Sequence, residues 1–135
     1  MKLSEKERQT IVSFLVKNLD PYFIVLFGSA CTNRMRTDSD VDIAFYGGRQ
    51  STGYELFIMK QDLAAILRRD VDLVDLDRVS TVFQAQIIGK GRLIYDNNKN
   101  LRQQFYILTL KKYARLNEER NEILKRIGER GMVYG

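Results

Sequence analysis

The fold is specified most clearly by residues 22–46, which read YFIVLFGSACTNRMRTDSDVDIAFY. The stretch opens with six apolar or aromatic residues, which is the length of a buried strand and far short of a membrane span. Gly28-Ser29 ends this strand, and a polar connection follows as far as Ser39. From Val41 to Tyr46 every second residue is large and apolar, which is the period of a strand. Residues 22–46 therefore predict two strands joined by a polar connection.

Helix and strand patterns continue on both sides of this stretch. Ser4 and Glu7 have the spacing of a capping box, which predicts the start of a helix that Pro21 stops. The remaining predicted elements, in chain order, are a helix over 54–69, a strand over 71–76, a short helix that Ser80 caps, a strand over 92–95 and a helix over about 101–130. This order predicts an α/β (α+β) fold, with a small mixed β-sheet, flanking helices and a long C-terminal helix.

The composition limits the chemistry that the chain can use. Its 135 residues and 44% hydrophobic content suit a single domain over residues 1–135. It has no histidine and only one cysteine, which excludes histidine bases, histidine metal ligands, disulfides within the chain and cysteine-based zinc sites. No apolar signal core or membrane-length run occurs, so we expect a cytoplasmic protein. Any catalysis must therefore rely on carboxylates, lysine, tyrosine or a bound ion.

The net charge of +5 lies entirely in the C-terminal segment. Residues 99–130 contain nine Lys/Arg and four Glu, whereas the rest of the chain has 13 basic and 13 acidic residues. A basic helix either binds an acidic protein surface or nucleic acid, or presents a solvated face. Of these partners we expect a protein, with no direct nucleic-acid binding.

The apolar pattern of the C-terminal helix changes along its length. Its first half is dense in apolar residues, which predicts packing on the protein's own sheet: Leu101, Phe105, Tyr106, Ile107, Leu108 and Leu110. Beyond Tyr113 the apolar residues are sparse: Leu116, Ile123, Leu124 and Ile127. A narrow stripe of this kind suits a partner helix. The helix is therefore the candidate surface for homo-oligomers or hetero-oligomers.

Asp40 and Asp42 are the first candidate site residues. Residues two apart on a strand point to the same face, with Cα atoms roughly 6.6 Å apart. Two carboxylates so placed can share a pair of divalent cations, and Mg²⁺ prefers oxygen ligands. Gly28 permits a close backbone approach to an anion, and Ser29 adds a hydroxyl. The spacing therefore predicts a site for two Mg²⁺ ions and a triphosphate, and the alternative is an ordinary polar turn at residues 37–40.

Asp72 is the candidate for a third carboxylate. In the predicted strand over 71–76 it shares a face with Val74 and Leu76, where a charge is costly unless it is paired or metal-bound. Asp75, on the other face, is the alternative. An EF-hand interpretation of residues 38–49 fails because the turn glycine and the terminal Glu are absent, and no Walker A sequence occurs.

A Gly-Ser pair, ten residues and Asp-x-Asp, entered from an apolar strand, resemble the DNA polymerase β-type nucleotidyltransferase superfamily. The small size resembles its minimal nucleotidyltransferase (MNT) branch. Weaker agreement at residues 38–44, 71–76 and 86–95 extends the resemblance over about residues 22–96, which we expect to be the core of the domain. The resemblance implies a nucleotidyltransferase fold, with these site residues: Gly28 and Ser29 at the phosphates, and Asp40, Asp42 and Asp72 as metal-binding and catalytic residues.

The resemblance also implies a partner. Members of this branch resemble antitoxins that pair with a HEPN-domain toxin, a helical RNase, and some transfer AMP from ATP to toxin tyrosines, releasing pyrophosphate. We therefore expect a metal-dependent protein adenylyltransferase that acts as an antitoxin. The alternatives are a non-catalytic antitoxin that acts by binding, and a small-molecule nucleotidyltransferase. The branch often has an arginine shortly after Gly-Ser, which this chain lacks, and Arg34 or Arg36 are the candidates to replace it.

Overall fold

The computed structural model describes the backbone of residues 3–31 and 40–134, and the side chains of residues 3–29 and 40–129. The elements follow in this order: α1 (Glu5–Asn18), β1 (Phe23–Phe27), the 3-10 turn η1 (Gly28–Cys31), β2 (Val41–Tyr46), α2 (Gly53–Leu67), β3 (Val71–Asp75), the 3-10 turn η2 (Leu76–Arg78), α3 (Thr81–Lys90), β4 (Arg92–Asp96) and α4 (Lys99–Tyr134). This mixture of helices and strands confirms the fold class predicted from the sequence.

In the described part of the chain, four strands form one mixed sheet in the order β3-β2-β1-β4. β1 pairs antiparallel with both β2 and β4, whereas β2 and β3 are parallel. The four residues Phe23 to Leu26 are buried because β1 is covered on both faces, which explains its continuous apolar run. Because of these strand directions, one end of the sheet carries the end of β1 and the starts of β2, β3 and β4.

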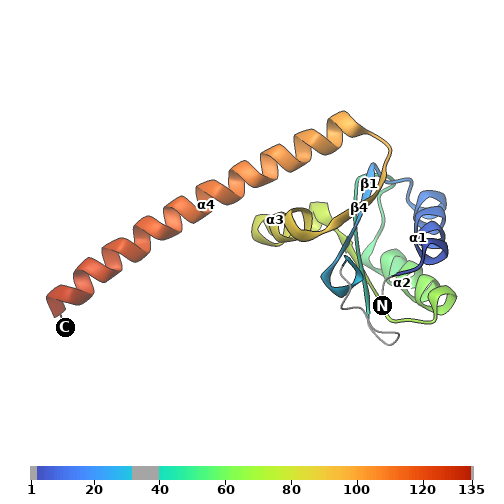
Figure 1. The fold of residues 1–135 in the computed structure, drawn as a ribbon, viewed down its shortest axis with the longest axis horizontal. Coiled ribbons are helices and arrows are strands. Elements are labelled where there is room, and N and C mark those ends of the chain that lie inside the picture. Colours follow the sequence, from blue (N-terminus) through green and yellow to red (C-terminus); the bar gives the residue numbers. More distant parts are fainter. Residues whose placement is uncertain (1–2, 32–39, 135) are drawn as a thin grey trace.

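Helices cover both faces of the sheet (Figure 1). Side chains of one strand alternate between the two faces, so the sheet separates two apolar cores. α1 and α2 cover the first core, which includes Ile11, Leu15, Ile24, Ile43 and Leu63. α3 and the first turns of α4 cover the second core, which includes Phe23, Val25, Ala44, Ile87 and Phe105.

The helices begin at the residues that cap them. Ser4 Oγ accepts the N–H of Glu7, and the Glu7 carboxylate accepts the N–H of Ser4, both at 3.1 Å, which confirms the predicted capping box. Ser80 accepts the N–H of Phe83 at the start of α3, also as predicted. A second capping box, formed by Thr52 and Glu55, begins α2 and was not among the predicted helix starts, although the sequence contains its pattern.

α4 is 36 residues long and projects well beyond the sheet (Figure 1). Its first turns pack on the second core through Phe105 and Tyr106, and Thr109 is also buried. The prediction that its whole apolar first half packs on the sheet is wrong, because three members are about half exposed: Ile107 (55%), Leu108 (54%) and Leu110 (45%). A helix presents one face to a flat sheet, so the other apolar positions point away.

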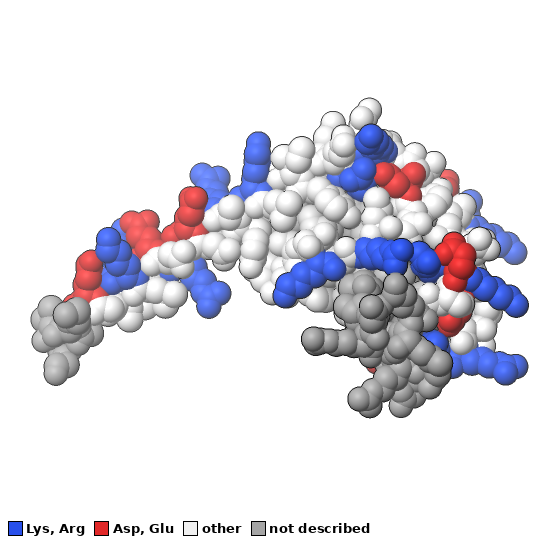
Figure 2. Space-filling model, in the orientation of Figure 1, with Lys and Arg blue, Asp and Glu red and all other residues white. Residues whose placement is uncertain are grey.

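The projecting part of α4 carries an exposed apolar stripe. Leu116, Ile123, Leu124 and Ile127 are all exposed. Figure 2 shows basic and acidic side chains interspersed along this part of the helix. The exposed stripe of α4 is therefore a surface that the protein's own core leaves uncovered.

None of the helices in the described residues is long and apolar enough to cross a membrane.

Candidate active site

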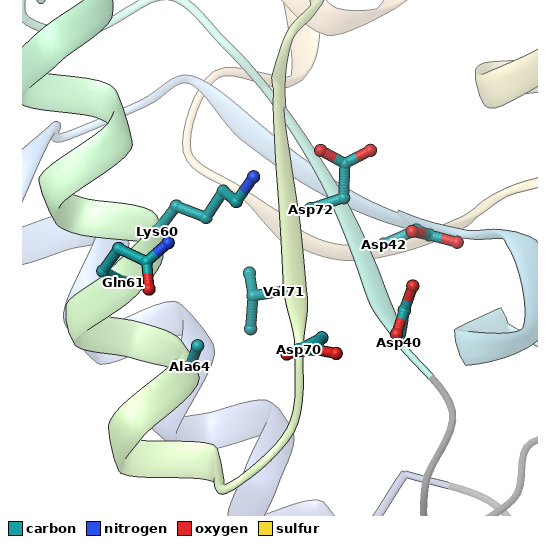
Figure 3. A pocket seen from close by; sticks show the side chains of 8 residues that line it. All are labelled: Asp40, Asp42, Lys60, Gln61, Ala64, Asp70, Val71 and Asp72. Carbon is teal, nitrogen blue, oxygen red and sulfur yellow. The ribbon is translucent and has the colours of Figure 1, made fainter.

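The three predicted carboxylates lie at one end of the sheet. Asp42 is in register with Phe27 at the end of β1 and with Asp72 at the start of β3. Asp40 lies directly ahead of β2, two residues before Asp42. Residues two apart share a face, and register neighbours in a sheet point the same way. The fold thus brings Asp40, Asp42 and Asp72 together from separate parts of the chain (Figure 3).

Gly28 lies directly against Asp42. Its φ is +63°, in the left-handed region, and a Cβ placed on it would lie 2.3 Å from the Asp42 carboxylate oxygen Oδ2. Any side chain at position 28 would therefore clash with Asp42 and strain the backbone. The backbone turn after β1 therefore approaches the Asp42 carboxylate closely. This approach is possible because glycine has no side chain at position 28.

We expect Gly28→Ala to lower the melting temperature and to abolish nucleotide binding. The added methyl group displaces the Asp42 carboxylate, and the left-handed backbone costs about 1–2 kcal/mol more for alanine than for glycine. Thermal unfolding with and without ATP and Mg²⁺ measures both effects. Gly89→Ala is the matched control, since a Cβ at this helical glycine meets nothing within 4 Å. A Gly28→Ala protein with the wild-type melting temperature and nucleotide response would contradict the contact with Asp42.

The carboxylates at this end of the sheet repel one another. Burial of Asp42, followed by the nearby charges of Asp72 and Asp40, raises the pKa of the Asp42 carboxyl above its ordinary value. Within the described residues, no Lys or Arg forms an ion pair with any of the three carboxylates. A divalent cation would relieve this repulsion, so the charge of the site fits a metal ion.

The carboxylates line a pocket of about 430 Å³. Its lining residues are Asp40, Asp42, Lys60, Gln61, Ala64, Asp70, Val71 and Asp72. Figure 3 shows the α2 residues on one side of β3 and the three candidate carboxylates on the other, so the pocket continues around this edge strand. In the part of the chain that the structure describes, no three acidic side chains already surround a common point. Metal binding would therefore draw these oxygen donors inward, and an all-oxygen set fits Mg²⁺.

Asp72 lies beside Asp42 but differs from the expectation in its burial. The sequence pattern predicts a buried charge, whereas the Asp72 side chain is exposed on the face of β3 opposite the buried side chains of Val71 and Leu73. Asp72 is therefore a candidate for the site because it lies next to Asp42, and not because its charge is buried. Asp75, the alternative, accepts the N–H of Asp77 at 3.0 Å and lies 3.4 Å from the Arg78 guanidinium, so its carboxylate stabilises η2.

The phosphate side of the site is only partly described. After β1 the backbone forms a 3-10 turn, Gly28–Cys31. Arg34 and Arg36, the candidates for a cationic partner of the triphosphate, lie outside the described residues. Arg92 begins β4 and is in register with Leu26, so it lies at the same end of the sheet as the turn after β1. The sequence alone does not show that Arg92 lies near the turn after β1, because the pairing of β1 with β4 brings them together.

Comparison with known families identifies the class of protein. Residues 9–100 match the family described as Polymerase beta, Nucleotidyltransferase. The match covers more than half of the chain and includes all three candidate carboxylates. The chain therefore belongs to this family and is a nucleotidyltransferase.

Comparison with individual proteins shows which members of the family this chain resembles. The chain is 29% identical over 123 residues to the protein adenylyltransferase MntA of Shewanella oneidensis, covering 90% of this chain and 88% of MntA. Its fold is similar to a chain of a toxin–antitoxin crystal structure with AMP-PNP (TM-score 0.78, 30% identity, 89% of this chain and 97% of that chain). It is also similar to a chain of the complex between a tri-AMPylated Shewanella oneidensis HEPN toxin and its MNT antitoxin (TM-score 0.75, 28% identity, 93% and 98% coverage). These similarities confirm the predicted nucleotidyltransferase fold and the resemblance to MNT antitoxins.

Proposed function

We propose that this protein is an antitoxin that transfers AMP from ATP to a tyrosine hydroxyl of a HEPN-type RNase toxin, with Mg²⁺ bound at the carboxylates. The observation that carries the proposal is the position of Gly28, Asp42 and Asp72 on, or directly after, three adjacent strands at one end of the sheet. The similarity to an adenylyltransferase supports AMP as the transferred group. The AMPylated toxin in a related complex supports a HEPN toxin as the acceptor.

Each candidate residue has a role in the proposed reaction. Gly28 and Ser29 bind phosphates of ATP, and Asp40, Asp42 and Asp72 hold the metal ions. Bound Mg²⁺ ions neutralise phosphate charge and polarise the attacked phosphorus. Asp72 accepts the proton of the tyrosine hydroxyl. The tyrosine oxygen then bonds to the α-phosphorus, the bond from that phosphorus to the bridging oxygen breaks, and pyrophosphate leaves.

A protein acceptor suits this chain better than a small molecule. The pocket is lined by one helix and two strands with their flanking residues, and α4 projects away from the sheet instead of folding over it (Figure 1). An acceptor pocket for a small molecule would need walls on more sides. A partner protein brings its own surface around the acceptor hydroxyl, as a toxin would.

Label transfer tests the proposed reaction. ATP labelled at the α-phosphate should mark the toxin, and ATP labelled at the γ-phosphate should not, because AMP transfer retains only the α-phosphate. Transfer of the γ-label would instead indicate a phosphoryltransferase. Neither label on the toxin, with a stable complex and an inactive RNase, would support the non-catalytic antitoxin.

We also propose that the exposed stripe of α4 contributes to partner binding. Ile123→Asp combined with Ile127→Asp places two charges on this stripe, where both side chains are more than half exposed. We expect association with the toxin, or self-association, to weaken at least tenfold, about 1.4 kcal/mol. Titration calorimetry and light scattering measure the change, and ATP with Mg²⁺ should still raise the melting temperature.

Lys125→Asp is the matched control for this variant. It changes the net charge by the same amount on the opposite side of the helix, because residues 123 and 125 are about 200° apart around the axis. Its association should stay close to that of wild type. If wild type, the Ile123/Ile127 variant and Lys125→Asp all associated equally, the projecting part of α4 would simply face solvent. That result would refute its role in partner binding.

A further inference from the structure

α2 carries large apolar residues on its inner side and also on its outer side, where they lie among the exposed polar residues Glu55, Gln61 and Asp62. Its inner side packs into the first core through Leu56, Met59, Leu63 and Leu67. Its outer side exposes Tyr54 (74%), Phe57 (51%) and Ile58 (39%). Exposed large apolar side chains that lie together on a surface mark a candidate interaction site. We call Tyr54, Phe57 and Ile58 the α2 patch.

The α2 patch adjoins the pocket that the carboxylates line. Phe57, Gln61 and Ala64 are spaced four and three residues apart, so they form one stripe along the helix. Gln61 and Ala64 line the pocket, together with Asp42 and Asp72. Figure 3 shows Lys60 reaching from α2 towards β3. Phe57 therefore lies about one helical turn from the pocket residue Gln61, on the same stripe of α2.

The order of groups along the end of the sheet indicates from which side an acceptor enters. Gly28 follows β1, Asp42 lies on the middle strand β2, and Asp72 lies on the edge strand β3. In a phosphoryl-type displacement the attacking and leaving oxygens are roughly in line, on opposite sides of the phosphorus. With the leaving phosphates at Gly28, the acceptor hydroxyl arrives from the β3 side, where the pocket continues around the edge strand from the carboxylates to α2 on the other face of the sheet.

We propose that the α2 patch docks the segment of the partner protein that carries the acceptor hydroxyl. This inference rests on the proposed function and adds the surface that selects the acceptor. The occupant is a polypeptide segment with apolar or aromatic side chains next to its tyrosine, because the patch offers two aromatic rings and an isoleucine and no charge. A free tyrosine would reach the pocket without covering this patch. α4 and the α2 patch would then both contribute affinity for the partner, and the α2 patch would also place its hydroxyl.

Tyr54→Ser combined with Phe57→Ser tests the proposal in the full-length protein, with the purified toxin as partner. Both side chains are exposed, so folding should be preserved, and the melting shift with ATP and Mg²⁺ should match wild type. We expect kcat/KM for AMP transfer to the toxin, and the affinity for the toxin, to fall at least tenfold. Ile66→Ser is the matched control: Ile66 is 55% exposed on the same helix but lies about two and a half turns beyond Phe57, on the opposite side.

The outcomes separate this inference from the proposed function. Wild-type transfer and affinity in the Tyr54/Phe57 variant would overturn the inference and leave the proposed function intact. A wild-type protein that transfers no AMP would refute the proposed function, and the affinity measurement would still decide whether the α2 patch binds the toxin. Self-association that disappears in the Tyr54/Phe57 variant alone, with toxin binding unchanged, would assign the patch to a second copy of this chain and so overturn the proposed occupant.

Discussion

Asp42→Asn is expected to fold normally and to lose AMP transfer by at least about a hundredfold, since even removing a group that supports a metal ligand costs 10–100-fold. Asp42 lies at the centre of the site, in register with the end of β1 on one side and with Asp72 on the other. The amide keeps the size of the side chain and removes the charge that a cation requires. Transfer rates at saturating ATP and Mg²⁺ measure the loss.

The same substitution should leave the melting temperature of the metal-free protein unchanged or higher. The folded-state pKa of Asp42 is raised by burial and by Asp72 and Asp40. A carboxyl with a raised pKa favours folding only below its unfolded-state pKa, and this contribution is lost as the pH rises through the folded-state value. Above the raised pKa the ionised Asp42 therefore opposes folding, and asparagine removes that penalty.

Asp75→Asn is the matched control for Asp42→Asn. It removes one carboxylate charge from the same strand as Asp72, but at the other end of β3, and the cap that Asp75 forms on η2 can be formed equally well by asparagine. We expect this variant to transfer AMP at close to the wild-type rate. A well-folded Asp42→Asn protein with near wild-type transfer would refute the metal assignment, and an inactive Asp75→Asn protein would move the third carboxylate from Asp72 to Asp75.

ATP and Mg²⁺ together should raise the melting temperature by several degrees, and ATP with a chelator should have much less effect. Ligand at a hundred times its dissociation constant stabilises the folded state by about 2.7 kcal/mol, which for a chain of this size is a shift of that order. The repelling carboxylates accept a triphosphate only when a cation lies between them. Equal shifts with and without divalent metal would show that nucleotide binds elsewhere.

The pH dependence of this shift follows from the raised pKa of Asp42. Metal binding requires the ionised carboxylate, so protons compete with Mg²⁺. As the pH falls from 7 towards the raised pKa, the stabilisation by ATP and Mg²⁺ should shrink before the fold itself is lost. Repeating the melting series at falling pH measures this, and in Asp42→Asn any remaining shift should lose this dependence. A shift that stays constant down to the acid unfolding of the protein would argue against Asp42 as a ligand.

Local patterns in the sequence predicted the elements of the fold well. The residues that begin α1 and α3, Ser4 and Ser80, act through hydrogen bonds over three residues, which a linear pattern contains. The alternation from Val41 to Tyr46 matches the bounds of β2, because a strand with buried side chains must follow a period of two. Both Asp40 and Asp42 could be selected on this basis.

The features that the sequence did not reveal depend on how distant segments pack. Asp72 is exposed because it lies on the face of β3 opposite the one that α2 covers, and the pattern of a single strand does not show which of its faces a helix covers. The contact between Gly28 and Asp42 arises from pairing of β1 with β2. The uncovered side of α2 could not be anticipated either, since apolar residues on both sides of a helix normally predict burial.

Intact-mass spectrometry of the toxin, after incubation with this protein, ATP and Mg²⁺, tests the central claim most directly. The account predicts that the toxin gains the mass of one or more AMP groups, located on tyrosine by fragmentation, with pyrophosphate released in equal amount. The gain should be absent with Asp42→Asn and with a chelator. A toxin that forms the complex and keeps its original mass, while ATP remains intact, would contradict the account and leave an antitoxin that acts by binding alone.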